Sequence, residues 1–441
     1  MLVLVCSSCK EFLDVKPSSK LAVPHSLKDL QALLDHPTAF TTLDGGLSGE
    51  SSTTDYYLLK NDLDALQGFE RNLYTWAKAD VFAPVNNDWF NFYKHIFTSN
   101  VILENIKNIE RNTTNASEWD NVKGQAHFVR AKMMFAAAQI WCLVYDVNYA
   151  TSEPGLVIRE DSDFNKVSKR SSLKETFDYI LADATAATNL LEVKVGFQTR
   201  ANKAAAYALL ARIQLYMGDA PLALAAAEKA LAIKSELLDY NTLNATATYP
   251  VTLMNREVLF HQSMAGMNTM TNSRLRVLRE LYDRYEPDDL RRTVYFRTNA
   301  DGTIGFKGSF TGSNGYFSGM ALDEVYLIAA EGYAKAGRLP EAAITLNTLL
   351  KSRFKIGKYM VKVFSNREEA LETIFTERRK SLLYRGLRWG DVKRLNREGQ
   401  NITLRREVEG DELSLQPHDR RYALPIPESV VDISEVVQNR Y

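Results

Sequence analysis

The chain has 441 residues, 54 Lys and Arg against 54 Asp and Glu, and 45% apolar residues, which excludes intrinsic disorder. Zero net charge gives no long-range attraction for polyanions, so nucleic acid is not expected as a partner. Only 22 glycines and 12 prolines occur, which favours helices over an all-β sandwich, and no apolar run reaches the ~18 residues of a membrane-spanning helix.

The first nine residues, MLVLVCSSC, are typical of the end of an export signal. The small residues Ser7 and Ser8 precede Cys9, which is the arrangement at which bacterial lipoproteins are cleaved and acylated. We therefore predict that residues 1–8 are a signal-peptide remnant and that Cys9 carries the lipid. An ordinary N-terminus with incidental cysteines is the alternative. Cys142, beside Trp141, is expected to be a buried small hydrophobe.

Apolar residues recur at three- and four-residue steps over residues 89–109, 125–143 and 173–191, which predicts three helices. Trp89 and Tyr93 are four residues apart in the first, so we assign them to the helical body and not to a ligand site. The loop before the third helix contains Asp161-x-Asp163-x-Asn165, the first three ligand spacings of a calcium loop. It lacks the glycine and glutamate that such a loop needs, so we predict a solvated acidic loop and no metal.

Two later segments share one pattern, centred on Gly218 and Gly337. In each, a large residue stands eleven positions before the glycine, small residues stand seven before and five after, and apolar residues stand nine, twelve and thirteen after. This pattern is typical of a tetratricopeptide-like pair of antiparallel helices, in which the glycine ends the first helix in a left-handed conformation. The two pairs are 119 residues apart (337 minus 218), so the repeats are interrupted and not tandem.

We therefore predict a mainly α protein in which residues 9–441 form one body. A helical scaffold is expected from residues 89–143, 173–233 and 321–395. Residues 38–88 and 242–319 are rich in Asn, Gly, Thr, Ser and aromatics, and we expect them to form a second, irregular lobe of loops and short strands.

Several ordered elements then identify a resemblance to the SusD/RagB family, the outer-membrane nutrient-binding lipoproteins of Bacteroidetes. Residues 9–17 resemble the family's mature N-terminus, and residues 93–103 and 124–131 resemble its first helical motifs. Residues 205–219 and 325–330 follow its tetratricopeptide helices, 377–394 resemble its C-terminal signature, and 424–427 with 438–441 resemble its closing motif. We interpret Arg378, Arg388, Trp389 and Asp391, within that signature, as a structural network.

The resemblance implies a SusD-like fold and a surface lipoprotein of the outer membrane that captures a glycan, or alternatively a peptide. It also implies a partner, a SusC-like TonB-dependent transporter, on which the protein sits as a lid. It implies no enzyme activity and no cofactor, and no catalytic motif occurs in the sequence. A tetratricopeptide scaffold for protein partners and a hydrolase remain as further alternatives.

Sugars bind by stacking on aromatic faces and by hydrogen bonds to polar side chains. Candidates for these roles gather in the two loop-rich regions, where Gly312, Gly315 and Gly319 favour a loop tip in the second. The predicted ligand-binding residues are Tyr56, Tyr57, Tyr74, Trp76, Asn86, Asn87, Asn314, Tyr316 and Phe317.

Overall fold

The computed structural model describes residues 24–36, 44, 46–163 and 165–441. The predicted signal remnant, residues 1–8, and Cys9 lie outside the described residues, as do residues 37–43 and 45 of the predicted second lobe. In the described part, no helix combines the length and the apolar character that crossing a membrane requires.

Helices dominate the structure, as the sequence predicts. The longer ones are α1 (Leu27–Leu34), α5 (Asp88–Asn105), α6 (Ala116–Trp141), α7 (Leu173–Leu190), α8 (Lys203–Met217), α9 (Ala220–Ile233), α12 (Leu322–Lys335), α13 (Leu339–Lys351), α14 (Arg367–Ser381) and α15 (Arg388–Arg397). The shorter ones are α2 (Leu47–Ser51), α3 (Lys60–Asp64), α4 (Gly68–Tyr74), α10 (Arg279–Tyr282), α11 (Arg291–Val294) and α16 (Glu428–Val431).

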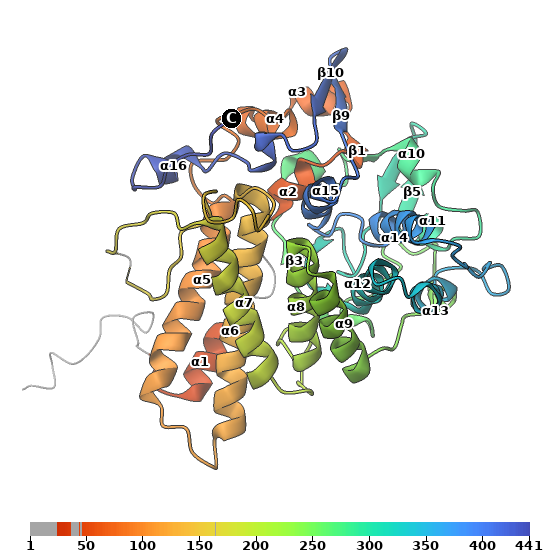
Figure 1. Ribbon diagram of the computed structural model, residues 1–441. Coiled ribbons are helices and arrows are strands. Elements are labelled where there is room, and N and C mark those ends of the chain that lie inside the picture. The colour runs from red at the N-terminus through yellow and green to blue at the C-terminus, as the bar shows by residue number, and fades with distance from the viewer. Residues whose placement is uncertain (1–23, 37–43, 45, 164) are drawn as a thin grey trace, which may run out of the picture.

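The helical scaffold is a row of neighbours. Helix α5 packs on α6, α6 on α7, α7 on α8, α8 on α9, α9 on α12 and α12 on α13, so that the row follows the chain from left to right in Figure 1. Between α9 and α12 the chain leaves this row and forms most of the second region. The prediction of a mainly α fold with interrupted helix pairs is confirmed.

The turns of the two predicted helix pairs have the expected geometry. Gly218 ends α8 with φ +94°, and Gly337 lies between α12 and α13 with φ +75°. A residue with a Cβ is strained in this left-handed region, so glycine suits both turns. Where α9 meets α12, a Cβ on Gly332 would lie 2.8 Å from the Leu224 Cβ, which shows how closely the two pairs pack.

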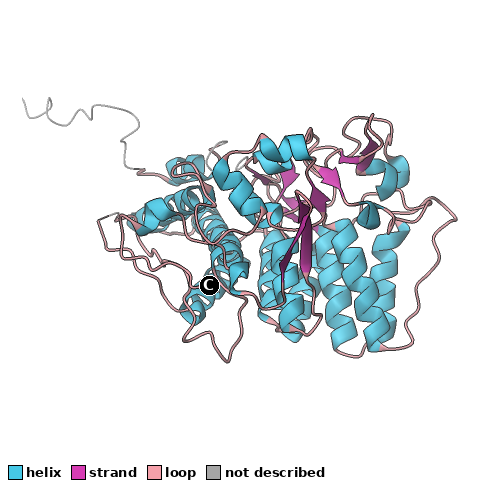
Figure 2. Ribbon diagram, turned by 90° about the horizontal axis from the view of Figure 1, so that it is seen from above, coloured by secondary structure: helices cyan, strands magenta, loops and turns pink. Residues whose placement is uncertain are grey.

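Short antiparallel ladders hold the second region together, and Figure 2 shows them gathered beside the helices. The pairs are β1 (Tyr56–Tyr57) with β4 (Arg276–Val277), β2 (Val258–Phe260) with β8 (Met320–Ala321), β3 (Ser263–Met264) with β7 (Tyr316–Phe317), β5 (Phe296–Thr298) with β6 (Ile304–Phe306), and β9 (Leu404–Val408) with β10 (Asp411–Leu415). Short helices occur here as well, although the sequence predicts only loops and strands. Helix α4, for example, begins at a capping box formed by Gln67 and Glu70.

Two clusters of buried apolar side chains underlie these regions. The larger lies among the scaffold helices and includes Phe92, Phe135 and Trp141. The smaller is rich in tyrosine and phenylalanine and draws residues from β1, β6, β7 and the turn after α14. Cys142 is buried and unpaired, as the sequence predicts.

The charged side chains near α14 and α15 form a buried network. The Arg378 Nε donates to Asp391 at 2.8 Å, and the Arg394 guanidinium pairs with Glu331 at 2.6 Å. Trp389 is buried beside them, and Arg388 lies 3.7 Å from the Asp55 carboxylate. These residues brace α15 against the scaffold, which is a structural role.

Candidate functional site

Five of the predicted sugar-stacking rings are buried, so the prediction that they face a ligand is wrong for this structure. Tyr56, Tyr74, Tyr316 and Phe317 belong to the smaller apolar cluster, and Trp76 belongs to the larger. The Tyr56 hydroxyl donates to the Ser51 carbonyl at 2.9 Å, and the Trp76 Nε1 donates to the Ser52 carbonyl at 2.9 Å. Their polar atoms are therefore satisfied inside the protein.

The other four predicted residues stay near the surface. Asn86 and Asn314 are exposed, whereas Tyr57 and Asn87 are half-buried. Asn87 caps α5, since its Oδ1 accepts from the Phe90 amide at 3.1 Å. None of the four lines the groove described below, and their role in ligand binding stays a prediction.

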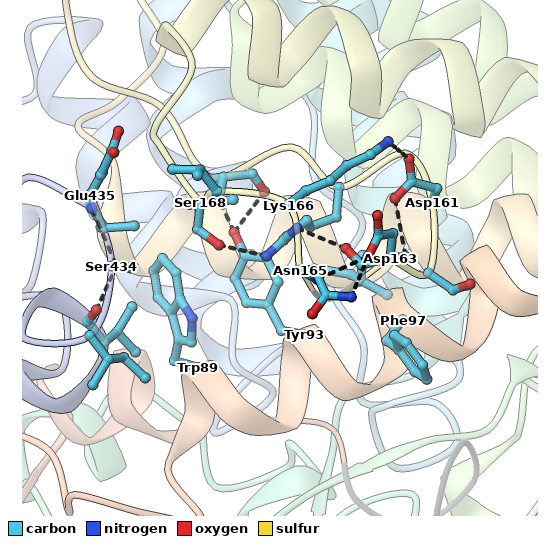
Figure 3. Close-up of a pocket in the computed structure, with 18 of the residues that line it drawn as sticks. Trp89, Tyr93, Phe97, Asp161, Asp163, Asn165, Lys166, Ser168, Ser434 and Glu435 are labelled. Carbon is cyan, nitrogen blue, oxygen red and sulfur yellow. Dashed lines mark hydrogen bonds and ion pairs between the residues drawn. The ribbon is translucent and has the colours of Figure 1, made fainter.

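The structure instead presents a groove of about 840 Å³. One wall is a face of α5, the second is the loop of residues 157–163 and 165–168, and the third is the C-terminal segment of residues 430–436. Figure 3 shows side chains from all three segments around it. We call this cavity the α5 groove.

Aromatic side chains form the α5 wall. The rings of Trp89 and Tyr93 stack with their centroids 4.7 Å apart and an angle of 23° between their planes. Trp89 is 7% exposed, whereas Phe97, one turn beyond Tyr93, is 45% exposed. Trp89 and Tyr93 thus line the groove together with Phe97, which differs from their assignment to the helical body alone, and Phe97 is the more exposed ring at the cavity.

The loop is fastened to α5 by three polar side chains. The Tyr93 hydroxyl donates to the Val157 carbonyl at 2.8 Å, and burial raises the pKa of this tyrosine. The Asn100 Nδ2 donates to the Arg159 and Asp161 carbonyls at 3.0 and 2.8 Å. Glu104 accepts from the Ser162 amide at 2.9 Å. The loop that forms the second wall is thus attached to α5 both at its start and near its middle.

Asn100 is itself held in place from behind. The Arg130 Nη1 donates to the Asn100 Oδ1 at 2.7 Å, and the Arg130 Nε pairs with Asp183 on α7 at 2.7 Å. Burial works against the charged form of Asp183, but hydrogen bonds from Arg130 and His127 lower its pKa below the usual value. The fixed Asn100 therefore links the groove to the scaffold core.

The groove also contains polar groups of several kinds. The Arg159 Nη2 donates to the Ser168 Oγ at 2.6 Å, and Lys166 pairs with Asp161, whose pKa the hydrogen bond from Lys166 lowers. In the described residues no salt bridge is found for Asp163, Asp432 or Glu435. Both signs of charge are present, with carboxylates in excess.

A metal ion has no evident set of ligands at this place. Among residues 24–36, 44, 46–163 and 165–441, no group of three or more His, Cys, Asp and Glu side chains is arranged to hold one. The Asp163 Oδ1 accepts from the amide and side chain of Asn165, and Asp161 is engaged by Lys166. These contacts are those of a folded acidic loop.

The sequence reasoning missed this groove, although a signal for it exists. The apolar stripe of α5 continues past Tyr93 to Phe97, on the same face that meets the polar loop after residue 157. A stripe that ends beside a polar loop marks the border between core and surface. The contribution of residues 430–436 has no local sequence signal, because it depends on the path of the whole chain.

Comparison with known proteins agrees with this architecture. A family model described as "Starch-binding associating with outer membrane" matches residues 11–215, and one described as "SusD family" matches residues 246–441. No curated protein matches the sequence.

Solved structures of similar fold come from Bacteroides. A SusD superfamily protein from Bacteroides thetaiotaomicron is 20% identical with a TM-score of 0.76, and the match covers 94% of this chain and 100% of that one. A SusD superfamily protein from Bacteroides vulgatus is 18% identical with a TM-score of 0.76, covering 94% and 99%. A SusD-like carbohydrate binding protein from Bacteroides vulgatus is 18% identical with a TM-score of 0.69, covering 92% and 96%. With two family models that together span both regions of the fold, the chain belongs to the SusD family.

Proposed function

We propose that this protein captures a glycan at the surface of the outer membrane and passes it to a SusC-like TonB-dependent transporter. The observation that carries the proposal is the α5 groove, in which the exposed ring of Phe97 lies among amide, hydroxyl and carboxylate side chains. An aromatic face for the C–H side of a pyranose and polar groups for its hydroxyls are what sugar binding requires. One solved protein of the same fold is described as carbohydrate binding, which supports this ligand class.

Capture without turnover fits the site. The groove contains carboxylates, but it lies open along the surface between three segments, and its Asp161 is neutralised by Lys166. We therefore propose a binding protein and not an enzyme. A peptide is the alternative ligand, since the polar groups of the groove would also serve a peptide backbone.

The ligand proposal is tested by replacing Phe97 with alanine. Loss of one stacking face is expected to weaken glycan binding about two- to tenfold, because an aromatic contact contributes about 0.5–1.5 kcal/mol beyond its buried area. Calorimetry against a panel of polysaccharides measures the change. Phe90→Ala is the matched control, since Phe90 is 51% exposed on the same helix and does not line the groove. Equal effects of the two variants, or binding to peptides alone, would refute the proposal.

The anchor is tested independently. In cells, behind a complete export signal, and with membranes washed in about 0.5 M NaCl to weaken reversible electrostatic contacts, Cys9→Ala is expected to move the protein from the membrane fraction to the soluble fraction, because the lipid would be lost. Cys6→Ala is the control and should stay with the membrane. Unchanged membrane association of the Cys9 variant would show that the lipid is not attached there.

A further inference from the structure

The segment between α13 and α14, residues 352–366, presents four aliphatic side chains to the outside. Ile356, Met360, Val361 and Val363 are 82%, 80%, 60% and 78% exposed. In Figure 1 this segment leaves the end of α13 and forms the right-hand edge of the molecule. Single exposed aliphatic residues are ordinary on protein surfaces. Four of them within a stretch of eight residues form an apolar patch, and such patches are typical of interaction sites.

The same segment is held firmly from its inner side. Phe354 and Phe364 are buried, and the Tyr359 ring packs against Phe354 with centroids 5.1 Å apart. On α13, the Asn347 Nδ2 donates to the Lys362 carbonyl at 2.8 Å, and its Oδ1 accepts from the Lys362 amide at 2.8 Å. The aliphatic side chains are therefore displayed by an anchored segment.

Four lysines lie within or beside the patch, Lys351, Lys355, Lys358 and Lys362, whereas Arg353 is buried and paired with Glu257. Lys355 and Lys362 face Asp288 and Glu286 from a neighbouring element, at 2.9 and 3.7 Å. For Lys351 and Lys358, no salt bridge is found within the described part of the chain. These two lysines leave positive charge at the rim of the aliphatic patch.

We propose that this segment docks on a lipid surface that carries anionic headgroups. Aliphatic side chains flanked by lysines suit the boundary between headgroups and acyl chains, where the lysines meet phosphates. The shape also favours lipid over a folded partner. Side chains that are 60–82% exposed project from the surface, and projecting side chains enter between mobile headgroups without a preformed pocket. This docking is independent of the α5 groove and of any acyl chain at Cys9.

Vesicle sedimentation tests the docking with the full chain, purified from a cytoplasm in which no acyl chain is attached. Vesicles of phosphatidylcholine alone are compared with vesicles that contain about 30 mol% phosphatidylglycerol. We expect binding to the anionic vesicles to exceed binding to the neutral ones about tenfold, and to fall severalfold in about 0.5 M NaCl.

Two variants separate the aliphatic and the basic contributions. The triple variant Met360→Ser, Val361→Ser, Val363→Ser should reduce binding to anionic vesicles about tenfold. Its control replaces Val147, Val193 and Val437, which are exposed elsewhere, with serine. The double variant Lys351→Gln, Lys358→Gln should remove the preference for anionic lipid, whereas Lys107→Gln, Lys194→Gln should keep it.

Every substituted side chain of the patch is exposed, so we expect the variants to have the same melting temperature as the wild type. The melting temperature of each variant is measured beside its vesicle assay. Equal binding to both vesicle types, no binding to either, or equal loss in the patch variant and its control would each overturn the proposal.

Discussion

Replacing Arg353 with methionine is expected to lower the free energy of unfolding by about 3–5 kcal/mol. The guanidinium is completely buried and donates through Nη2 to both Glu257 carboxylate oxygens, at 2.8 and 2.7 Å. Its Nη1 donates to the Leu238 carbonyl at 2.9 Å. Methionine fills a similar volume but leaves the Glu257 carboxylate as an unpaired buried charge, which is the main cost. Chemical denaturation measures the change.

Two further variants isolate that cost. In the double variant Arg353→Met, Glu257→Gln, the amide oxygen can still accept from the Leu238 amide, as Glu257 does at 2.7 Å, without carrying a charge. We expect it to recover about half of the lost stability. Arg256→Met is the matched control at the adjacent position, where the Arg256–Glu236 pair is exposed, and should cost less than about 1 kcal/mol. A similar cost for Arg353 and Arg256 would contradict the explanation.

The second large effect is a dependence of stability on pH at Glu50. This glutamate on α2 is fully buried, and burial together with the nearby Asp55 carboxylate raises its pKa to about 8 from 4.5. Between pH 4.5 and 8, therefore, the Glu50 carboxyl keeps its proton in the folded protein, whereas in the unfolded chain it has lost it. The stabilising contribution of this proton is complete below pH 4.5 and is lost as the pH rises toward 8, by about 5 kcal/mol at most.

Glu50→Gln is expected to remove this dependence. A neutral amide can still accept from the Gly386 amide, which donates to the Glu50 Oε2 at 2.8 Å, and it has no proton to lose. Unfolding free energies of the variant and the wild type should therefore diverge as the pH is raised from 5 to about 8, with the variant the more stable. Glu412→Gln, an exposed control in β10, should run parallel to the wild type. A constant difference between Glu50→Gln and the wild type would disprove the shift.

Local patterns predicted the scaffold because its determinants are local. The left-handed turns at Gly218 and Gly337 depend on a glycine between two apolar helices, and that information lies within one helix pair. The order of the helices along the chain also predicts their arrangement in space, because most of them pack on their sequence neighbours. The packing of α12 on α9, after the long excursion through the second region, and that of α14 on α12 lie outside that rule.

The prediction of ligand-facing rings was wrong because the burial of a ring is not determined locally. Gly315 and Gly319 mark turns on either side of Tyr316 and Phe317, but turn residues do not reveal what covers the strand between them. Strand β7 pairs with β3, about fifty residues earlier, and the Tyr316 ring stacks on Phe306. Burial of these rings is therefore decided by contacts between distant segments. Phe97 was overlooked because its exposure depends on the loop that reaches α5 only in the folded chain.

The attachment of the groove's loop to α5 has a consequence for the speed of capture. Tyr93, Asn100 and Glu104 fasten residues 157–162 within the protein itself. A ligand then does not have to order this segment on arrival, so little conformational entropy is lost and no slow closing step precedes contact. Association is governed by diffusion and orientation, and release is governed by the few contacts that the ligand makes. The proposed transfer of a glycan to a transporter would benefit from both, because rapid uptake and rapid release would allow many transfers in a short time.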